Sequence, residues 1–171
     1  MPNAVIAAVI LAIAAIACVT DVRTRKIPNV LTFGTTLAAL LVHLVTGGAH
    51  GAATALGGWL LGTALFLPFF LLRGMGAGDV KLLAALGAWL GPRDVVWLGI
   101  YSSILGGALA VGVSLARGYL PAAMRNVGGL LSYWSAVGFR PAPDLTLDSR
   151  APRLAYGIPI LAGTAVTLWL R

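Results

Sequence analysis

The sequence NAVIAAVILAIAAIACVTD, residues 3–21, indicates the environment in which this chain folds. It consists almost entirely of Ala, Val, Ile and Leu, and no charged side chain precedes Asp21. A helix that crosses a lipid bilayer needs about 20 mostly apolar residues. Residues 3–20 therefore predict a transmembrane helix that Asp21 closes.

The composition of the whole chain also indicates a membrane protein. Hydrophobic residues make up 59% of the 171 residues and charged residues only 10%, whereas roughly a quarter of the residues in a soluble domain are charged. In a soluble protein the net charge of +7 would suggest a nucleic-acid partner. In a membrane protein the basic residues set the orientation instead. The expected partner is the lipid bilayer, and no nucleic acid is expected.

Further apolar runs predict the remaining helices, over residues 29–46, 52–72, 79–91, 95–116 and 156–170. Glycines at 47–51 interrupt the second and third runs, and Pro92 ends the fourth. The predicted fold class is all-α: a polytopic integral membrane protein with about six transmembrane segments and no soluble domain. Residues 1–171 are expected to form a single membrane-embedded domain.

Residues 117–155 are the one long segment that is not expected to span the bilayer. In its first half, apolar residues recur at helical spacing, including Leu120, Met124, Val127 and Leu131. This pattern predicts an amphipathic helix at the membrane interface. The proline-containing second half, residues 140–144, predicts an extended loop.

The basic residues predict the orientation. If the 20–28 loop is cytoplasmic and each helix crosses the membrane, ten Lys and Arg residues lie inside, leaving only Arg93 and Arg171 outside. Cytoplasmic loops carry the excess of basic residues, so the N-terminus is predicted outside. Asp21 and Asp79 are then both at the cytoplasmic face of the inner membrane. The alternation requires the 79–91 segment to cross the bilayer.

The segment DVRTRKIPN, residues 21–29, contains the first candidate site. Asp21 follows the first helix, and Pro28 lies near the start of the second, where a missing N–H is tolerated. Taken alone, Asp21 fits an ordinary solvated acid that the neighbouring basic residues neutralise.

The segment GMGAGDVKL, residues 74–82, contains the second candidate site. Its glycines allow close backbone approach and positive φ. Non-helical backbone at membrane depth is tolerated only against protein or a water-filled cavity, so Asp79 is not expected to face lipid. The alternative is that Asp79 merely caps a helix. A phosphate-binding loop is excluded, because its Gly-Lys-Ser/Thr pattern is missing.

Two aspartates on one membrane face can hydrolyse a peptide together. Acidic residues within membranes are costly and by default functional, and two adjacent carboxyl groups share a proton. The ionised carboxylate can accept a proton from water while the protonated carboxyl polarises the scissile carbonyl. This chemistry needs no metal or cofactor, and none is expected. Cys18, the only cysteine, excludes a Cys-based zinc site within one chain.

At these residues the chain resembles the type IV prepilin peptidases, membrane aspartic proteases of the Gly-x-Gly-Asp type. Residues 21–29 resemble the first aspartate motif of that family, which ends in Ile27, Pro28 and Asn29. Residues 76–82 resemble the second, with Gly76, Gly78 and Asp79, and residues 156–160 resemble the start of the family's last helix.

The resemblance implies that Asp21 and Asp79 are the catalytic pair and that the substrate is a prepilin or pseudopilin precursor. The short cytoplasmic leader of that precursor would be cleaved. Lys81 is expected either to tune the pair or to meet an acidic residue just after the cleavage site. An ordinary lysine whose charge reaches the interface is the alternative.

The chain departs from the larger bifunctional members of the family. Those carry a four-cysteine cytoplasmic domain near the N-terminus and also methylate the new N-terminus, whereas the loop after the first helix is short here and has no cysteine. Peptidase activity without methyltransferase activity is therefore expected. The small size resembles the compact branch that serves tight-adherence (Flp-type) pili, and an archaeal preflagellin peptidase is an alternative.

Three other functions remain as alternatives. A signal peptide peptidase would be longer and would have a Tyr-Asp pair, whereas Thr20 precedes Asp21 here. A small transporter or proton channel would use the acids as a relay near the membrane midplane. A non-enzymatic scaffold of a secretion system would tolerate replacement of either aspartate.

Overall fold

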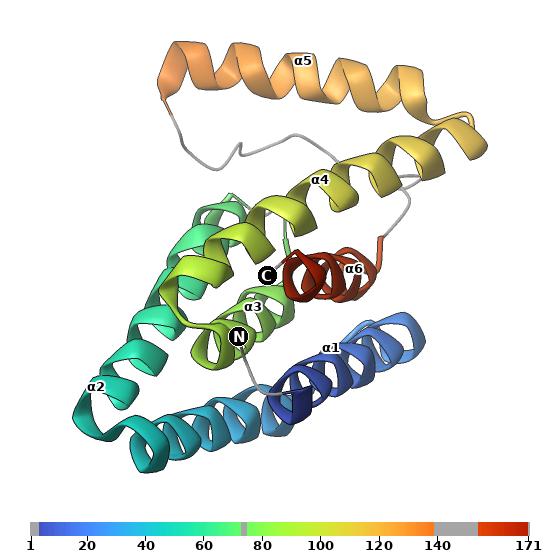
Figure 1. Cartoon of the computed structure of the whole chain (residues 1–171). Coiled ribbons are helices and arrows are strands. Elements are labelled where there is room, and N and C mark those ends of the chain that lie inside the picture. Colours follow the sequence, from blue (N-terminus) through green and yellow to red (C-terminus); the bar gives the residue numbers. More distant parts are fainter. Residues whose placement is uncertain (1–3, 73–74, 139–153, 171) are drawn as a thin grey trace.

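A computed structural model describes residues 4–72, 75–138 and 154–170, and in these residues it contains six α-helices and no strand. The helices are α1 (Ala4–Thr24), α2 (Asn29–Leu71), α3 (Ala77–Leu90), α4 (Pro92–Ala116), α5 (Leu120–Val137) and α6 (Gly157–Trp169). In Figure 1, α3 lies in the middle of the bundle, while α5 lies apart from α1 and α3 on the far side of α4. The predicted all-α class is confirmed.

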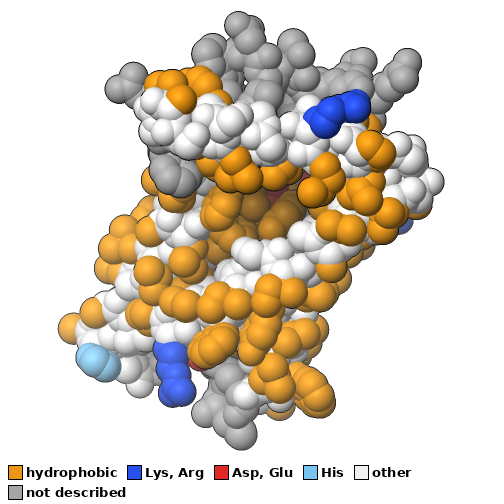
Figure 2. Space-filling model, turned by 90° about the horizontal axis from the view of Figure 1, so that it is seen from above, with side chains coloured by type: hydrophobic (Ala, Val, Ile, Leu, Met, Phe, Trp, Pro, Cys, Tyr) orange, Lys and Arg blue, Asp and Glu red, His pale blue; other side chains and the backbone are white. Residues whose placement is uncertain are grey.

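The outer surface of the bundle is apolar. The side chains of Val5, Val30 and Val45 are 72%, 86% and 84% exposed, and Figure 2 shows hydrophobic side chains across most of one face, with few charges. Helices α1, α2 and α4 are long and apolar enough to cross a membrane. Because so much exposed apolar surface is unfavourable in water, the chain is a multi-pass membrane protein.

Helix α2 contains the second and third predicted spans. At about 1.5 Å per residue, its 43 residues are about twice as long as a bilayer core requires. The backbone of Gly48 is non-helical, with φ 59° and ψ −148°, and Figure 1 shows the ribbon turning sharply. The predicted interruption at 47–51 is therefore a kink around Gly48, where a left-handed φ favours glycine.

Helix α3 is short and buried. All nine residues from Leu82 to Leu90 are buried. Its 14 residues extend only about 21 Å, less than the roughly 30 Å of a bilayer core. A helix buried on all sides lies inside a bundle rather than in lipid. Whether it crosses the whole bilayer, as the predicted orientation requires, stays a prediction.

Glycines bring α2 and α3 into direct backbone contact. A Cβ at Gly58 would overlap the carbonyl oxygen of Gly87, and one at Gly62 would lie 2.8 Å from the carbonyl oxygen of Leu83. Small residues spaced four apart allow such approach in membranes. This contact holds the part of α2 that follows the kink at Gly48 against α3.

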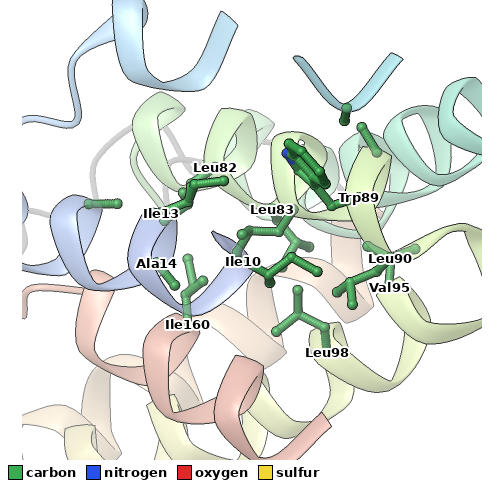
Figure 3. Close-up of a cluster of buried hydrophobic side chains, with 14 of the residues drawn as sticks. Ile10, Ile13, Ala14, Leu82, Leu83, Trp89, Leu90, Val95, Leu98 and Ile160 are labelled. Carbon is green, nitrogen blue, oxygen red and sulfur yellow. The ribbon is translucent and has the colours of Figure 1, made fainter. Parts of the chain in front are cut away.

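The core joins α3 to the helices around it. Figure 3 shows side chains of α1, α3, α4 and α6 meeting in one cluster, among them Ile10, Leu83, Leu98 and Ile160. Each of these four side chains is completely buried. The cluster fixes α3, α4 and α6 relative to α1.

The end of α1 and the start of α4 differ from the predicted boundaries, and the helix predicted within residues 117–155 now has defined ends. Helix α1 continues to Thr24, so Asp21 lies within its last turn and does not close it. Helix α4 begins at Pro92, which suits the first turn of a helix. The predicted helix in residues 117–155 is present as α5, none of whose residues is buried. Its place at the membrane interface stays a prediction, and the loop predicted over 140–144 lies outside the described residues.

Candidate active site

Asp21 and Asp79 are the only buried acidic side chains in the described parts of the chain, 8% and 9% exposed. Asp21 is in the last turn of α1, and Asp79 is in the first turn of α3. The charge of Asp21 acts on Asp79, so the two carboxyl groups are within electrostatic range of one another. The fold thus brings together two acids that are 58 positions apart in the sequence.

Backbone amides hold both carboxyl groups. The N–H of Gly157, the first residue of α6, donates to Oδ2 of Asp21 at 2.9 Å. Asp79 accepts a backbone hydrogen bond from Gly76, the N-cap residue of α3. Asp79 is therefore not itself the N-cap residue, although its side chain does satisfy an amide at the start of the helix.

The two motif segments contact each other directly. A Cβ at Gly78 would lie 3.3 Å from Cβ of Ile27, so the glycine allows α3 to approach the segment that links α1 to α2. Pro28, with φ −62° and ψ 134°, is the N-cap residue of α2, and its carbonyl accepts the amide of Thr32. The Ile-Pro sequence thus sets the direction in which α2 leaves the site.

Lys81 links the same two segments through its side chain. Its Nζ donates to Oδ1 of Asn29 at 2.9 Å and lies 5.5 Å from the centre of the Phe33 ring. Both partners are at the start of α2, whereas Lys81 is in α3. These contacts tie the second motif to the end of the first.

Sequence reasoning missed the contact of α6 with the site. Gly157 meets Asp21, and the adjacent Tyr156 is within electrostatic range of Asp79. Residues 156–160 had a recognisable pattern, but a hydrogen bond between residues 136 positions apart depends on how the helices pack. No local signal in the sequence reports it.

Among the described residues, no group of three His, Cys, Asp or Glu side chains could hold a metal ion. The groups that the described residues bring to this position are two carboxyl groups and their backbone donors. Such a pair can hold one proton between them and exchange it with a bound water.

Comparison with known proteins identifies the family. The model of the type IV leader peptidase family matches residues 8–111, more than half of the chain, and this match contains both aspartates. No solved structure matches the chain.

The curated relatives carry the name prepilin leader peptidase/N-methyltransferase. The protein from Aeromonas hydrophila is 37% identical over 105 residues, 58% of this chain and 36% of its own length. That from Burkholderia pseudomallei strain K96243 is 36% identical over 97 residues, 53% of this chain and 31% of its own. That from Neisseria gonorrhoeae is 33% identical over 105 residues, 57% of this chain and 36% of its own. The chain spans about a third of the length of these relatives, and on the family match it belongs to the type IV leader peptidase family.

Proposed function

We propose that this protein is a membrane aspartic endopeptidase that removes the leader peptide from a prepilin or pseudopilin precursor. The observation that carries the proposal is the buried pair Asp21 and Asp79, within electrostatic range and each held by a backbone amide. Two buried acids are costly in a membrane protein unless they serve a function. The family match and the names of the relatives support the same activity.

In the proposed reaction, the aspartate pair activates a water molecule. The ionised carboxylate accepts a proton from the water molecule while the oxygen of the water attacks the scissile carbonyl carbon. The protonated carboxyl group donates a hydrogen bond to the carbonyl oxygen and stabilises the tetrahedral intermediate. Collapse of this intermediate breaks the C–N bond, and the leaving nitrogen takes up a proton from the pair. No covalent enzyme intermediate forms.

The position of the pair suits cleavage near the membrane surface. Asp21 precedes the end of α1 by one turn, and Asp79 is in the first turn of α3, so both are close to helix ends. We place these ends at the cytoplasmic face, next to Arg23, Arg25 and Lys26. A precursor with an apolar segment in the bilayer and a leader in the cytoplasm would present its junction there.

We assign the surrounding motif residues to positioning. Gly76 and Gly78 let α3 begin close to the linker, Ile27 and Pro28 direct the start of α2, and Asn29 with Lys81 links the two segments. Lys81 has no acidic partner within the described residues, so its charge is available to an acidic residue of the substrate. The contact of Lys81 with Asn29 favours a structural role in addition.

The expectation that the protein lacks methyltransferase activity has no support from the relatives, since the name of each joins peptidase to N-methyltransferase. The short link between α1 and α2, residues 25–28, is the remaining observation that favours peptidase activity alone. Assignment to the compact Flp-type branch is likewise a proposal. One assay tests both proposals. Methylation of the product tests the first, and the precursor that is cleaved faster tests the second.

The test is a cleavage assay with purified protein in lipid and a Flp-type or a longer type IV prepilin. We expect wild type to release the leader, and Asp21→Asn and Asp79→Asn each to lower kcat more than about a hundredfold. Asp94→Asn, an acid in the first turn of α4, is the matched control and should retain activity. Mass spectrometry of the new N-terminus, with a methyl donor present, measures methylation.

Cleavage that persists in either variant would remove that aspartate from the mechanism. Failure of folded wild type to cut any pilin-like precursor would contradict the proposal and favour a scaffold or transporter.

A further inference from the structure

The start of α6 touches Asp21 through its backbone. Gly157 donates its N–H to Oδ2 of Asp21 at 2.9 Å in a buried hydrogen bond. The first amides of a helix have no partner within the helix, and the helix dipole favours negative charge at this end. The bond therefore satisfies the Gly157 amide and gives the Asp21 carboxylate a fixed donor.

Glycine at position 157 leaves room for this close approach. A Cβ there would lie 3.0 Å from the backbone Cα of Cys18 and 3.2 Å from both Cβ and Oδ2 of Asp21. The first of these contacts is with the backbone of α1 about one turn before Asp21, and backbone cannot rotate away as a side chain can. A side chain at position 157 would therefore require a small shift of α6 relative to the backbone of α1 or to Asp21.

The residue before Gly157 fixes α6 on its other side. The Tyr156 hydroxyl donates to the carbonyl oxygen of Ser102 in α4 at 3.4 Å. Its ring packs edge-on against Phe66 of α2, with 6.0 Å between ring centres, and lies over Gly106 of α4. Tyr156 and Gly157 therefore hold the start of α6 between α4 and α1.

We propose that Gly157 is a positioning residue for the reaction, whose backbone N–H orients the Asp21 carboxyl group toward Asp79 and the reacting water. The inference rests on the proposed peptidase function. Asp79 takes its own backbone bond from Gly76, within its own segment. The orientation of Asp21 alone depends on a helix distant in the sequence, so α6 completes the site.

Two variants separate the hydrogen bond from the packing. Replacing Gly157 by glycolic acid exchanges the N–H for an ester oxygen and adds no bulk, whereas Gly157→Ala keeps the N–H and adds a methyl group. We expect each to lower kcat about 10- to 100-fold, because misplacing a catalytic group by about 1 Å costs this much. KM for the precursor should stay within about twofold, since Gly157 is not proposed to bind substrate.

Matched controls are available nearby. The control for the ester variant is the same exchange at Gly163, which removes a backbone N–H from α6 at a position that faces Ser102 of α4 instead of Asp21. The control for Gly157→Ala is Gly107→Ala, which adds a methyl group where nothing lies within 4 Å. Both should retain the wild-type kcat. A folded ester variant of Gly157 with wild-type kcat would overturn the inference.

Hydrogen exchange tests the contact without any cleavage. The Gly157 amide should exchange at least about tenfold faster in Asp21→Ala than in wild type, because it loses its acceptor, whereas Asp79→Ala should leave it protected. Equal exchange in wild type and Asp21→Ala would also overturn the inference. If wild type fails to cleave any precursor, the proposed function is wrong, and the exchange result still decides whether this amide holds Asp21.

Discussion

At the residue scale, the candidate site depends on polar contacts between segments that the sequence keeps far apart. Asp21 takes its donor from α6, and Lys81 of α3 takes its acceptor, Asn29, from α2. The bond to Asp21 is buried, and in an apolar environment an unpaired polar group costs several kcal/mol, so this contact also restricts how α1 and α6 can pack. Catalytic geometry and helix packing are therefore linked through the same few side chains.

The Lys81–Asn29 contact should appear as a coupling energy. In a double-mutant cycle with Lys81→Met and Asn29→Ala, we expect a coupling of about 0.5–1.5 kcal/mol in the free energy of unfolding in mixed micelles. The control cycle pairs Lys81→Met with Asn126→Ala, which loses a bond to Tyr119 in α5 instead. A coupling no larger than in the control would mean that Lys81 does not hold the two motifs together.

At the scale of elements, the kinked α2 and the short α3 behave as one packed unit. Helix α3 can be buried on every side only because α2 folds back at Gly48 and presents glycines to it. The middle and C-terminal part of α3 is held by this contact and by the core cluster of Figure 3, and the helix carries Asp79 in its first turn. The stability of the α2–α3 pair should therefore govern the site.

Substitution of the contact glycines tests this directly. Gly58→Ala forces a methyl group onto the backbone of α3 and should destabilise the protein by about 1–3 kcal/mol. Gly34→Ala, in the same helix but with nothing within 4 Å, should be neutral or stabilise by up to about 1 kcal/mol. Unfolding in mixed micelles measures both, and equal effects would rule out the glycine contact as the cause.

At the scale of the whole molecule, the apolar exterior and the uneven distribution of basic residues along the chain predict how the protein lies in the bilayer. Both aspartates are at helix ends that share a side with Arg23, Arg25 and Lys26. By the same reasoning we predict that the amphipathic α5, with Met124, Val127 and Leu131 exposed, lies at the cytoplasmic interface.

Cysteine labelling in oriented vesicles tests this arrangement. In a Cys18→Ala background, a membrane-impermeant thiol reagent should reach Lys26→Cys and Gly129→Cys only from the cytoplasmic side, and Gly47→Cys only from the other. Val127→Cys, on the opposite side of α5 from Gly129, should react more slowly because lipid shields it. Labelling of positions 26 and 47 from the same side would refute the predicted orientation.

The sequence by itself determined the class of the protein and the two motifs. Apolar runs of bilayer length identify membrane helices, since no other environment accepts them. Glycine marked the kink at Gly48, and Pro92 marked the end of the 79–91 segment, because the backbone preferences of these residues are local. The start of α4 was predicted at residue 95, whereas α4 begins at Pro92. The predicted end of α1 at Asp21 is wrong, because the backbone hydrogen bonds of the helix do not depend on side-chain polarity and continue to Thr24.

Only the tertiary structure decided which groups meet. That α3 is buried and too short for a simple span, that Gly78 packs on Ile27, and that Gly157 donates to Asp21 all depend on contacts between distant segments. Helix periodicity and hydropathy describe each segment separately and carry no information about its neighbours. The two motifs and the family resemblance predict that Asp21 and Asp79 act as a pair, and the packing of α1, α3 and α6 is what brings the two carboxyl groups within electrostatic range.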